Sequence, residues 1–359
     1  MRVAFIVRPN LYKIAGGDTV QVDQTAKQLT GLGVEVDILL ANDEIPYEKY
    51  DLLHFFHITR PVAILYHSKL AKMPFVISTI YCSYGDYHKH NKKGVNNLFE
   101  RLPEDSKDYI RNVARWILGR ERLQIKSYLW EGQRKSIIKV LKAADYVLPN
   151  SQSELQRLRD DYSCQAKDVI VTNGINPEKF PFNPSIQKDN DLVICVGRIE
   201  RRKNQLNVIK ALNNTKYKLV LIGAPSPYQN DYYLQCREAA AENVTFLDRV
   251  PHDEMLKYYQ LAKVHVLASW FETTGLSSLE AAVMGCNIVI TDKGDTLDYF
   301  GDDAFYCDPG NPDSIKQAVD KAIEASFNEA LLEKILTAHT WKKAAEQTLE
   351  SYHLALTKK

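Results

Sequence analysis

The chain has 359 residues, which is enough for two domains that each bury a core. Its 46 Lys and Arg residues nearly balance 45 Asp and Glu residues, so the formal net charge is +1 and no general affinity for nucleic acid is expected. No apolar run approaches the roughly 20 residues of a membrane span, and the N-terminus starts with a strand pattern instead of a signal peptide.

The six cysteines are scattered, with no Cys-x-x-Cys pair and no histidine at metal-binding spacing. Cys195, for example, lies in the apolar run Val-Ile-Cys-Val. Buried free thiols in a reducing compartment are the simplest interpretation. The sequence therefore predicts a cytoplasmic protein, with peripheral contact at the inner face of the cell membrane as a further expectation.

The N-terminal part of the chain predicts alternating strands and helices. Residues 2–7 form an apolar run typical of a parallel strand that is covered on both faces. A helix is predicted over 18–32, capped by Asp18 or Thr19, and a second strand over 34–40. Residues 50–56 and 74–80 read as further strands, with a helix between them over 61–71. This is the start of a parallel α/β domain.

A glycine pair, Gly16 and Gly17, precedes the first helix. It is not the dinucleotide fingerprint, which needs Gly-x-Gly-x-x-Gly directly after the first strand. The missing fingerprint counts against an NAD-linked oxidoreductase. A plain flexible turn is the alternative interpretation of this pair.

A polar and aromatic stretch, residues 81–90, follows the strand at 74–80. Open α/β sheets bind ligands at the carboxyl ends of their strands, so Tyr81 and Asp86 are candidates for the acceptor side of a site. His88 and His90 lie too far along the chain to receive a catalytic role.

A basic helical region covers residues 107–142, where Arg and Lys side chains alternate with Trp116, Trp130 and aliphatic residues. Such a stretch can lie on an anionic membrane surface. The alternative is a helix pair packed on the domain with a solvated basic face.

The first domain is predicted to close with a strand at 144–148, a helix capped by Ser151 or Ser153, and a short strand at 169–171. Residues 182–191 are polar and contain proline, so they are interpreted as the linker. The predicted domains are 1–182, 183–340, and a C-terminal helix over 341–359.

The second domain is predicted to open with a strand at 192–196, directly followed by Gly197 and Arg198, with Lys203 five residues after Arg198. A guanidinium and an ammonium at the start of a helix can hold a diphosphate that would otherwise need a metal ion. A solvated basic loop is the alternative. Further strands are predicted at 218–222, 244–247, 264–267, 286–290 and 304–307, with helices at 255–261, 312–325 and 341–356.

The most informative stretch is 269–285, which contains Glu272 and Glu280 with seven residues between them. Gly275 introduces a helix whose first N–H groups suit an anion such as a diphosphate. Carboxylates beside such a site suit hydroxyl-rich groups, because each can accept two sugar O–H bonds. The alternative is a solvated loop glutamate and a surface helix glutamate.

This string resembles the Glu-x7-Glu motif of the family 4 retaining glycosyltransferases, and Gly197-Arg198 with Lys203 matches their Gly-Arg-x4-Lys pattern. The resemblance spans nearly the whole chain and is most specific in its C-terminal half. It implies the GT-B architecture, in which two Rossmann-like parallel-sheet domains face a cleft and a C-terminal helix crosses back to the first domain.

The resemblance also implies roles for individual residues. Arg198 and Lys203 stabilise the leaving diphosphate, Glu272 holds the hydroxyls of the donor sugar, and Glu280 holds the ribose. Attack on the front face retains the anomeric configuration, and no residue is assigned as a covalent nucleophile. The remaining donor-binding residues implied are Gly16, Gly17, Gly197, Thr273, Thr274, Gly275, Leu276, Arg249 and Val250.

The predicted function is transfer of a hexose from a UDP- or GDP-linked sugar to a glycan or lipid-linked oligosaccharide in surface polysaccharide synthesis, such as capsule or O-antigen. No metal or other cofactor is expected. A metal-dependent transferase would use Asp-x-Asp at the end of a strand, and Asp189-Asn190-Asp191 precedes one. The alternative function is a non-enzymatic or epimerase-type protein of the same fold that binds nucleotide sugars.

Overall fold

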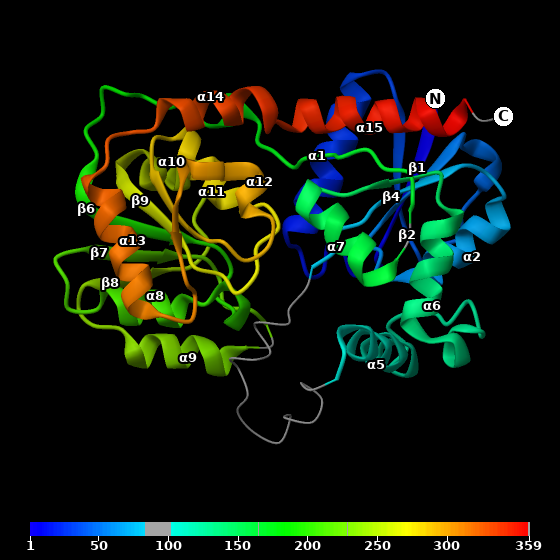
Figure 1. The fold of residues 1–359 in the computed structure, drawn as a ribbon, viewed down its shortest axis with the longest axis horizontal. Helices are drawn as coiled ribbons and strands as arrows, with labels where there is room; N and C mark the ends of the chain where they lie inside the picture. The colour runs from blue at the N-terminus through cyan, green and yellow to red at the C-terminus, as the bar shows by residue number, and fades with distance from the viewer. Residues whose placement is uncertain (83–101, 164, 228, 358–359) are drawn as a thin grey trace. The chain divides into compact units, whose positions relative to one another are not determined.

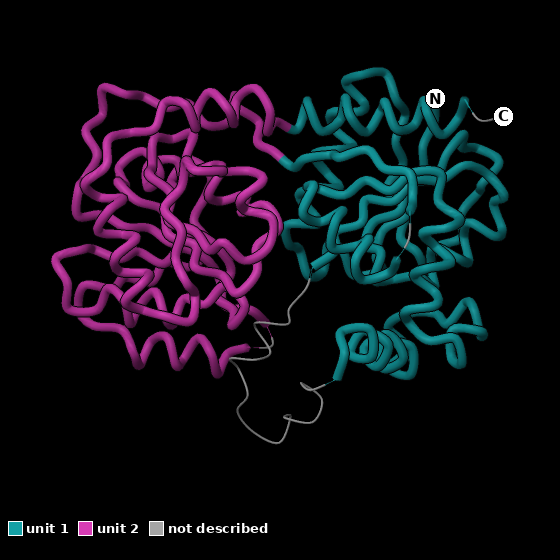
Figure 2. The backbone as a smooth tube through the Cα atoms, in the orientation of Figure 1, with its two compact units in different colours: residues 1–173, 341–359 teal, residues 174–340 magenta. Residues whose placement is uncertain are grey.

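The computed structural model describes residues 1–82, 102–163, 165–227 and 229–357. The chain forms two compact units: unit 1 consists of residues 1–173 and 341–359, and unit 2 of residues 174–340 (Figure 2). The boundary predicted from the sequence lies between residues 182 and 183. Residues 174–182 go with unit 2 because the Ile175 N–H donates to the His339 carbonyl at 3.0 Å, and Phe180 and Phe182 pack on the unit 2 core.

Unit 1 is built on a parallel sheet whose strands follow the order β2-β1-β3-β4-β5. Strands β1, β2 and β4 are labelled in Figure 1. The central strands are buried almost without interruption, as expected for a sheet covered on both faces. The strands are β1 (Arg2–Val7), β2 (Glu35–Leu40), β3 (Leu52–Phe56), β4 (Phe75–Ser78) and β5 (Tyr146–Leu148). The predicted strand at 169–171 is wrong: Val169 and Val171 donate backbone bonds to Val147 and Pro149, but only the bridge from Asp168 to Val147 forms.

The bounds of the unit 1 helices that precede residue 81 agree closely with the prediction, but the predicted cap by Asp18 or Thr19 is wrong, because Gly16 is the N-cap and Asp18 and Thr19 lie in the first turn of the helix. The basic region at 107–142 divides into α5 and α6, joined by residues 118–127, and α6 is kinked at Gly132, where φ is 74°. Lys107 is buried and donates to Glu104 at 2.9 Å, so it does not belong to a solvated basic face. The helices are α1 (Gly17–Gly31), α2 (Pro61–Ala71), α5 (Glu104–Ile117), α6 (Tyr128–Ala143), α7 (Gln152–Tyr162) and α15 (Trp341–Leu356).

Helix α7 is fixed to the sheet by the buried carboxylate of Glu154. Ser151 caps the helix, with its Oγ accepting from the Glu154 N–H at 2.9 Å. The Glu154 carboxylate accepts from the Thr79 hydroxyl, from the Tyr81 N–H at 2.8 Å and from the Asn150 N–H at 2.9 Å. These bonds satisfy the charge of Glu154 and order the chain at the end of β4.

The C-terminal helix α15 belongs to unit 1 and packs against α1. His54 of β3 connects it to the sheet: Nδ1 lies 2.7 Å from the Tyr352 hydroxyl and Nε2 lies 2.9 Å from the Ser78 hydroxyl. Both His54 and Tyr352 are fully buried. Burial lowers the pKa of His54 to about 3, so the imidazole is neutral in the folded protein.

Unit 2 is built on a parallel sheet in the order β11-β10-β9-β6-β7-β8. Its strands are β6 (Asp189–Val196), β7 (Lys218–Ile222), β8 (Val244–Leu247), β9 (Ala262–Leu267), β10 (Asn287–Thr291) and β11 (Phe305–Cys307). Asp189, interpreted above as part of the linker, instead begins β6 and pairs with Lys218 of the neighbouring strand at 3.0 Å.

Helices cover the unit 2 sheet (Figure 1). The core of this unit has two apolar clusters, one that includes residues of α8 and α13 and one that includes residues of α11 and α14. The helices are α8 (Gln205–Leu212), α9 (Asn230–Ala239), α10 (His252–Leu261), α11 (Leu276–Val283), α12 (Thr296–Phe300), α13 (Pro312–Glu324) and α14 (Glu329–Ala338). In the described part of the chain, no helix has the length and apolarity needed to cross a membrane.

We predict that acid weakens unit 1 through His54. A histidine with a folded pKa of about 3 binds its proton more readily when unfolded, so its contribution to stability is complete above the unfolded pKa and falls as the pH drops toward 3. Between pH 7 and pH 5 the free energy of unfolding is expected to fall by about 2 kcal/mol, because the imidazole of the unfolded chain has a pKa of about 6.5. Urea unfolding at the two pH values measures it.

His54→Gln should reduce this difference between pH 7 and pH 5, whereas His353→Gln, which changes an exposed histidine of α15, should leave it unchanged. Equal acid sensitivity of the wild type and His54→Gln would show that the titration of other groups dominates.

Candidate functional site

The loops after β6 and β9 meet at the carboxyl edge of the unit 2 sheet. These strands are parallel neighbours, with Val193 opposite Val264 and Ile194 opposite His265. Carboxyl ends of adjacent parallel strands lie at the same edge, which is where open α/β sheets bind ligands. The structure therefore brings together residues 197–204 and 268–275, two segments far apart in the sequence.

An ion pair joins the two loops. Lys203 Nζ lies 2.6 Å from Glu272 Oε2, and the two side chains are 26% and 11% exposed. The Trp270 N–H donates to the Arg202 carbonyl at 2.9 Å, which fixes the same loops through their backbones. Two of the predicted catalytic residues are therefore in direct contact.

Asn204 is a structural residue of this site that the sequence analysis missed. Its buried amide Nδ2 donates to the Ala268 carbonyl at 3.0 Å and to the Pro309 carbonyl at 2.7 Å. Its backbone is left-handed, with φ of 59°, where asparagine is tolerated better than most residues. An asparagine at the start of a helix, directly after the basic loop, was the available signal.

The backbone around Glu272 is also fixed. Its N–H donates to the Lys293 carbonyl at 3.0 Å, and its carbonyl accepts from the Asp295 N–H at 2.9 Å. A Cβ on Gly294 would lie 2.1 Å from the Glu272 carbonyl oxygen, so only glycine permits this approach. The loop after β10 thus holds Glu272 from the side opposite Lys203's loop.

Helix α11 begins directly after this loop, with Gly275 in a left-handed conformation at φ of 71°. Thr274 is buried and donates to the Tyr299 hydroxyl at 3.3 Å, and Ser277 donates to the Val196 carbonyl at 3.0 Å. Thr273 and Leu276 are partly exposed beside them. The N-terminus of α11 is therefore fixed at the end of β6, with its dipole favouring an anion.

Glu280 lies one turn further along α11 and has a different partner from Glu272. Its Oε2 accepts from the Tyr259 hydroxyl of α10 at 2.9 Å. Burial raises the pKa of Glu280 to about 7, and the Tyr259 hydrogen bond opposes this only in part. The carboxyl group is then both a donor and an acceptor near neutral pH.

The other residues predicted in the second domain lie at the same edge, and some are held by contacts while others are exposed. Arg198 Nη1 lies 3.9 Å from Glu200 Oε2, so the two side chains form an ion pair. Gly197 is in contact with the next loop, since a Cβ on Gly223 would lie 2.2 Å from its carbonyl oxygen. Arg249 is exposed after the edge strand β8, and Val250 packs on the core.

In unit 1, Gly16 immediately precedes α1 and Gly17 is its first residue, with open space where a Gly17 Cβ would stand. Tyr81 is buried and its hydroxyl donates to Asp161 at 2.6 Å, so this hydroxyl is bound within the domain. Burial, with a further contribution from Asp161, raises the pKa of Tyr81. Asp86 lies outside the described residues.

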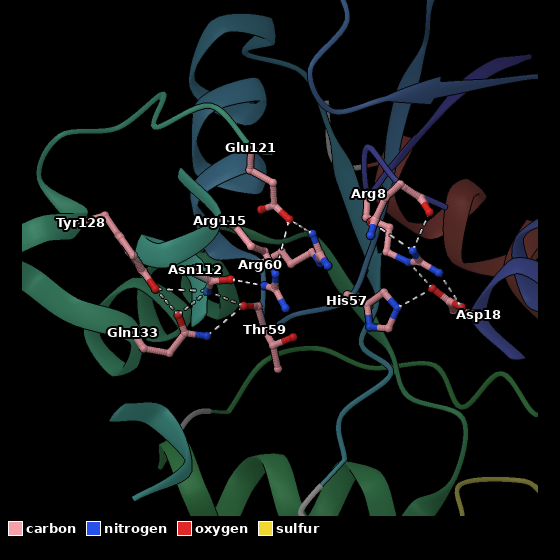
Figure 3. Close-up of polar contacts among 11 residues, drawn as sticks. Arg8, Asp18, His57, Thr59, Arg60, Asn112, Arg115, Glu121, Tyr128 and Gln133 are labelled. Atoms are coloured by element: carbon pink, nitrogen blue, oxygen red, sulfur yellow. Dashed lines mark hydrogen bonds and ion pairs between the residues drawn. The ribbon is translucent and has the colours of Figure 1, made fainter. Parts of the chain in front are cut away.

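Unit 1 contains a cluster of ionisable residues that the sequence analysis did not identify (Figure 3). Arg8 Nε donates to Asp18 at 2.6 Å, and His57 Nε2 lies 3.0 Å from the same carboxylate. Burial would raise the pKa of Asp18, but the bonds from His57 and Arg8 outweigh it and hold that pKa well below its ordinary value. Burial lowers the pKa of His57, although Asp18 opposes it.

A second ionic group lies beside the first. Arg60 donates to Glu121, and Arg115 Nε lies 3.8 Å from the same carboxylate oxygen (Figure 3).

His57 has a left-handed backbone with φ of 69°, which is uncommon outside glycine. The residues of the two ionic groups come from separate segments, so no local sequence motif could have joined them.

The chain is similar in sequence to known glycosyltransferases. Residues 176–347 match the family model described as "Glycosyl transferases group 1". An uncharacterized glycosyltransferase from Methanocaldococcus jannaschii is 23% identical over 99% of each chain. The N-acetylgalactosamine-N,N'-diacetylbacillosaminyl-diphospho-undecaprenol 4-alpha-N-acetylgalactosaminyltransferase of Campylobacter jejuni is 27% identical, over 82% of this chain and 83% of that protein.

Solved structures share the fold. Sucrose-phosphate synthase from Thermosynechococcus elongatus aligns over all of both chains with a TM-score of 0.75 at 18% identity. Anabaena HepE, solved in complex with UDP and glucose, aligns over 98% of this chain and 99% of that chain with a TM-score of 0.68 at 14% identity. The predicted GT-B fold class, with Rossmann-like parallel-sheet domains, is confirmed. Residues 176–347, which include nearly all of unit 2, match the glycosyltransferase group 1 family model.

Proposed function

We propose that the chain is a retaining, metal-independent glycosyltransferase that moves a hexose from a UDP- or GDP-linked sugar to a glycan or lipid-linked oligosaccharide. The observation that carries this proposal is the 2.6 Å contact between Lys203 and Glu272 beside the N-terminus of α11. A cation, a carboxylate and a helix N-terminus in one place suit a donor that combines a diphosphate with a sugar.

The cationic groups would act on the leaving group. As the bond between the anomeric carbon and the diphosphate breaks, negative charge grows on the diphosphate, and Lys203 and Arg198 stabilise it. The acceptor oxygen forms its bond on the same face of the sugar, and its proton passes to the departing diphosphate. This route retains the anomeric configuration without a metal ion and without an enzyme nucleophile.

The two carboxyl groups would orient the donor. Glu272 accepts hydrogen bonds from the sugar hydroxyls through Oε1, which has no hydrogen-bond partner among the described residues. Lys203 on Oε2 fixes the orientation of this carboxylate. Glu280, with its pKa raised to about 7, would bind the ribose hydroxyls as a donor or an acceptor. Gly197 and Gly275 would permit close approach of the donor to the backbone.

The names of similar proteins support a nucleotide-sugar donor and a surface glycan acceptor. HepE was solved with UDP-glucose, and a 25% identical relative covering 61% of this chain is the O-antigen chain mannosyltransferase B of Escherichia coli. The alternative, a non-enzymatic or epimerase-type protein of the same fold, would bind the same donors without transferring the sugar to an acceptor.

A nucleotide panel tests the donor proposal. We expect one of UDP, GDP or ADP, or a sugar linked to one of them, to raise the melting temperature of the purified protein, because binding to the folded state alone stabilises it. The shift should survive EDTA if the cationic side chains replace a metal. A shift that disappears with EDTA would contradict metal independence, and none with any nucleotide would contradict the donor site.

Lys203→Ala should lower kcat at least about 100-fold, because it removes a charge that stabilises the leaving diphosphate. The assay is release of the nucleoside diphosphate from whichever donor the panel identifies. Lys210→Ala, at an exposed position of the adjoining helix α8, is the matched control and should keep the wild-type rate. A Lys203→Ala variant with wild-type turnover would refute the assigned role.

We also propose that the basic helical region contacts an anionic membrane. The end of α5, the following loop and the start of α6 expose large apolar side chains: Ile117 is 71% exposed, Leu118 is 63% exposed and Trp130 is 72% exposed. Arg120, Arg122 and Lys126 are exposed within the same stretch. Apolar side chains flanked by cations suit the interface of an anionic bilayer.

The membrane proposal predicts co-sedimentation with vesicles that contain phosphatidylglycerol, weakened by high salt. Replacing both Ile117 and Trp130 with serine should reduce the bound fraction several-fold, since it removes apolar area that would enter the interface. Leu234→Ser, at an exposed position of α9 in unit 2, is the control for surface hydrophobicity. Binding that survives the double substitution would place any membrane contact elsewhere.

A further inference from the structure

Unit 1 has a pocket of its own at the carboxyl edge of its sheet. Val7 and Arg8 follow the end of β1, Phe56 ends β3, and the first turn of α2 lies beside them. The segment 118–127 covers the pocket, to which it contributes Glu121 and Gln124. None of the catalytic, donor-binding or acceptor-side residues predicted from the sequence lines this pocket, although part of the basic region at 107–142 does.

A carboxylate occupies the cationic part of the pocket. Glu121 reaches from the covering segment to Arg60, and Arg115 approaches the same oxygen at 3.8 Å (Figure 3). The Arg60 and Glu121 side chains are only 16% and 22% exposed. An oxyanion is thus held between guanidinium groups, which is the arrangement that carboxylates and phosphates share as ligands of arginine.

The cations around this carboxylate outnumber the acids. Burial lowers the pKa of Arg60; Glu121 opposes this, while the nearby positive charges of Arg115 and Arg8 lower it further. Arg122 also lines the pocket. Arg8 is balanced by Asp18. Among the described residues, Glu121 is the acid paired with both Arg60 and Arg115, and Asp108 is a further negative charge near Arg115. A ligand with more negative charge than one carboxylate would balance this group better.

The pocket, with a volume of about 40 Å³ while Glu121 occupies it, is otherwise lined by groups that can contact the part of a ligand next to its phosphate. Its remaining walls combine apolar and aromatic side chains with the amides of Asn42 and Gln124. Trp116 presents an aromatic ring of the kind that packs against the C–H face of a sugar. Amides and an aromatic ring beside paired guanidinium groups favour a polar ligand that carries a phosphate.

We propose that this pocket binds a phosphate group carried by the acceptor substrate, with Arg60 and Arg115 as its ligands and Glu121 as the group that phosphate displaces. Identification of the ligand as the acceptor rests on the function proposed above. The phosphate belongs either to a soluble sugar phosphate or to the headgroup of a lipid-linked acceptor, and the two share the chemistry that the arginines recognise.

Isothermal titration of the full chain tests the proposal without requiring glycosyl transfer. The probes are D-glucose 6-phosphate and octyl phosphate, with glucose and octyl glucoside as their uncharged counterparts. Arg60→Met should weaken binding of the phosphate probes at least about tenfold, because a charge-assisted bond is lost. Arg237→Met, which changes an exposed arginine of α9 in unit 2, should leave their affinity unchanged.

Glu121→Gln gives the sharpest result. If Glu121 competes with the ligand, its neutral variant should bind the phosphate probes several-fold more tightly than the wild type. A purely structural salt bridge predicts no gain, and an equal or weaker affinity would overturn the proposal. This variant carries the test alone if Arg60→Met does not fold.

The comparison of probes separates the two sources of phosphate. Tighter binding of glucose 6-phosphate indicates a soluble acceptor, and tighter binding of octyl phosphate indicates a lipid-linked one. Phosphate probes that bind no better than their uncharged counterparts would overturn the proposal. Because the nucleotide panel examines the donor site of unit 2 and this titration compares variants in unit 1, failure of the proposed function and failure of this site are distinguishable.

Discussion

The adjacency of β6 and β9 is the constraint on which the unit 2 site depends. Their parallel pairing brings Lys203 and Glu272 to one edge of the sheet. The backbone bond from Trp270 to Arg202 and the amide of Asn204 then hold the loops at fixed separation. Without this pairing, Glu272 would be a buried carboxylate with no cation beside it, which is costly in a protein interior. Sheet order therefore determines both the stability and the chemistry of the site.

A common electrostatic pattern appears in both units. Each unit has ion pairs between an acidic and a basic side chain at the carboxyl edge of its parallel sheet: Lys203 with Glu272 in unit 2, and Arg60 with Glu121 and Arg8 with Asp18 in unit 1. In a partly buried place each charge needs such a partner when no ligand is bound. An anionic ligand that binds at such an ion pair must either displace the acidic side chain or bind beside it. The ion pair therefore lowers the affinity for the ligand, but it keeps the basic side chain in position.

Much of unit 2 could be predicted because its signals are local. The glycine before α11, the two glutamates and the Gly-Arg-x4-Lys spacing all lie within short stretches, and their strands alternate with helices in the expected order. The unit 1 cluster could not be predicted in this way. Arg8, His57 and Glu121 lie far apart in the sequence. Arg8 and His57 follow the paired strands β1 and β3, and Glu121 reaches Arg60 from the segment between α5 and α6. The unit boundary was drawn from proline and polarity, whereas backbone pairing with His339 decides where residues 174–182 pack.

The β-bridge between Ile175 and Thr340 joins the two ends of unit 2. Its first and last residues lie side by side, and a Cβ on Gly174 would come within 2.4 Å of the His339 backbone, so the two ends are tightly joined. Unit 2 is thus one uninterrupted segment inserted into unit 1, which the chain enters and leaves at a single place. Such a segment can be exchanged as a cassette, in evolution or by recombination in the laboratory, because swapping it leaves both cores whole. Under the proposed function, such an exchange would change the donor preference that we assign to unit 2 and leave the acceptor pocket that we assign to unit 1 intact.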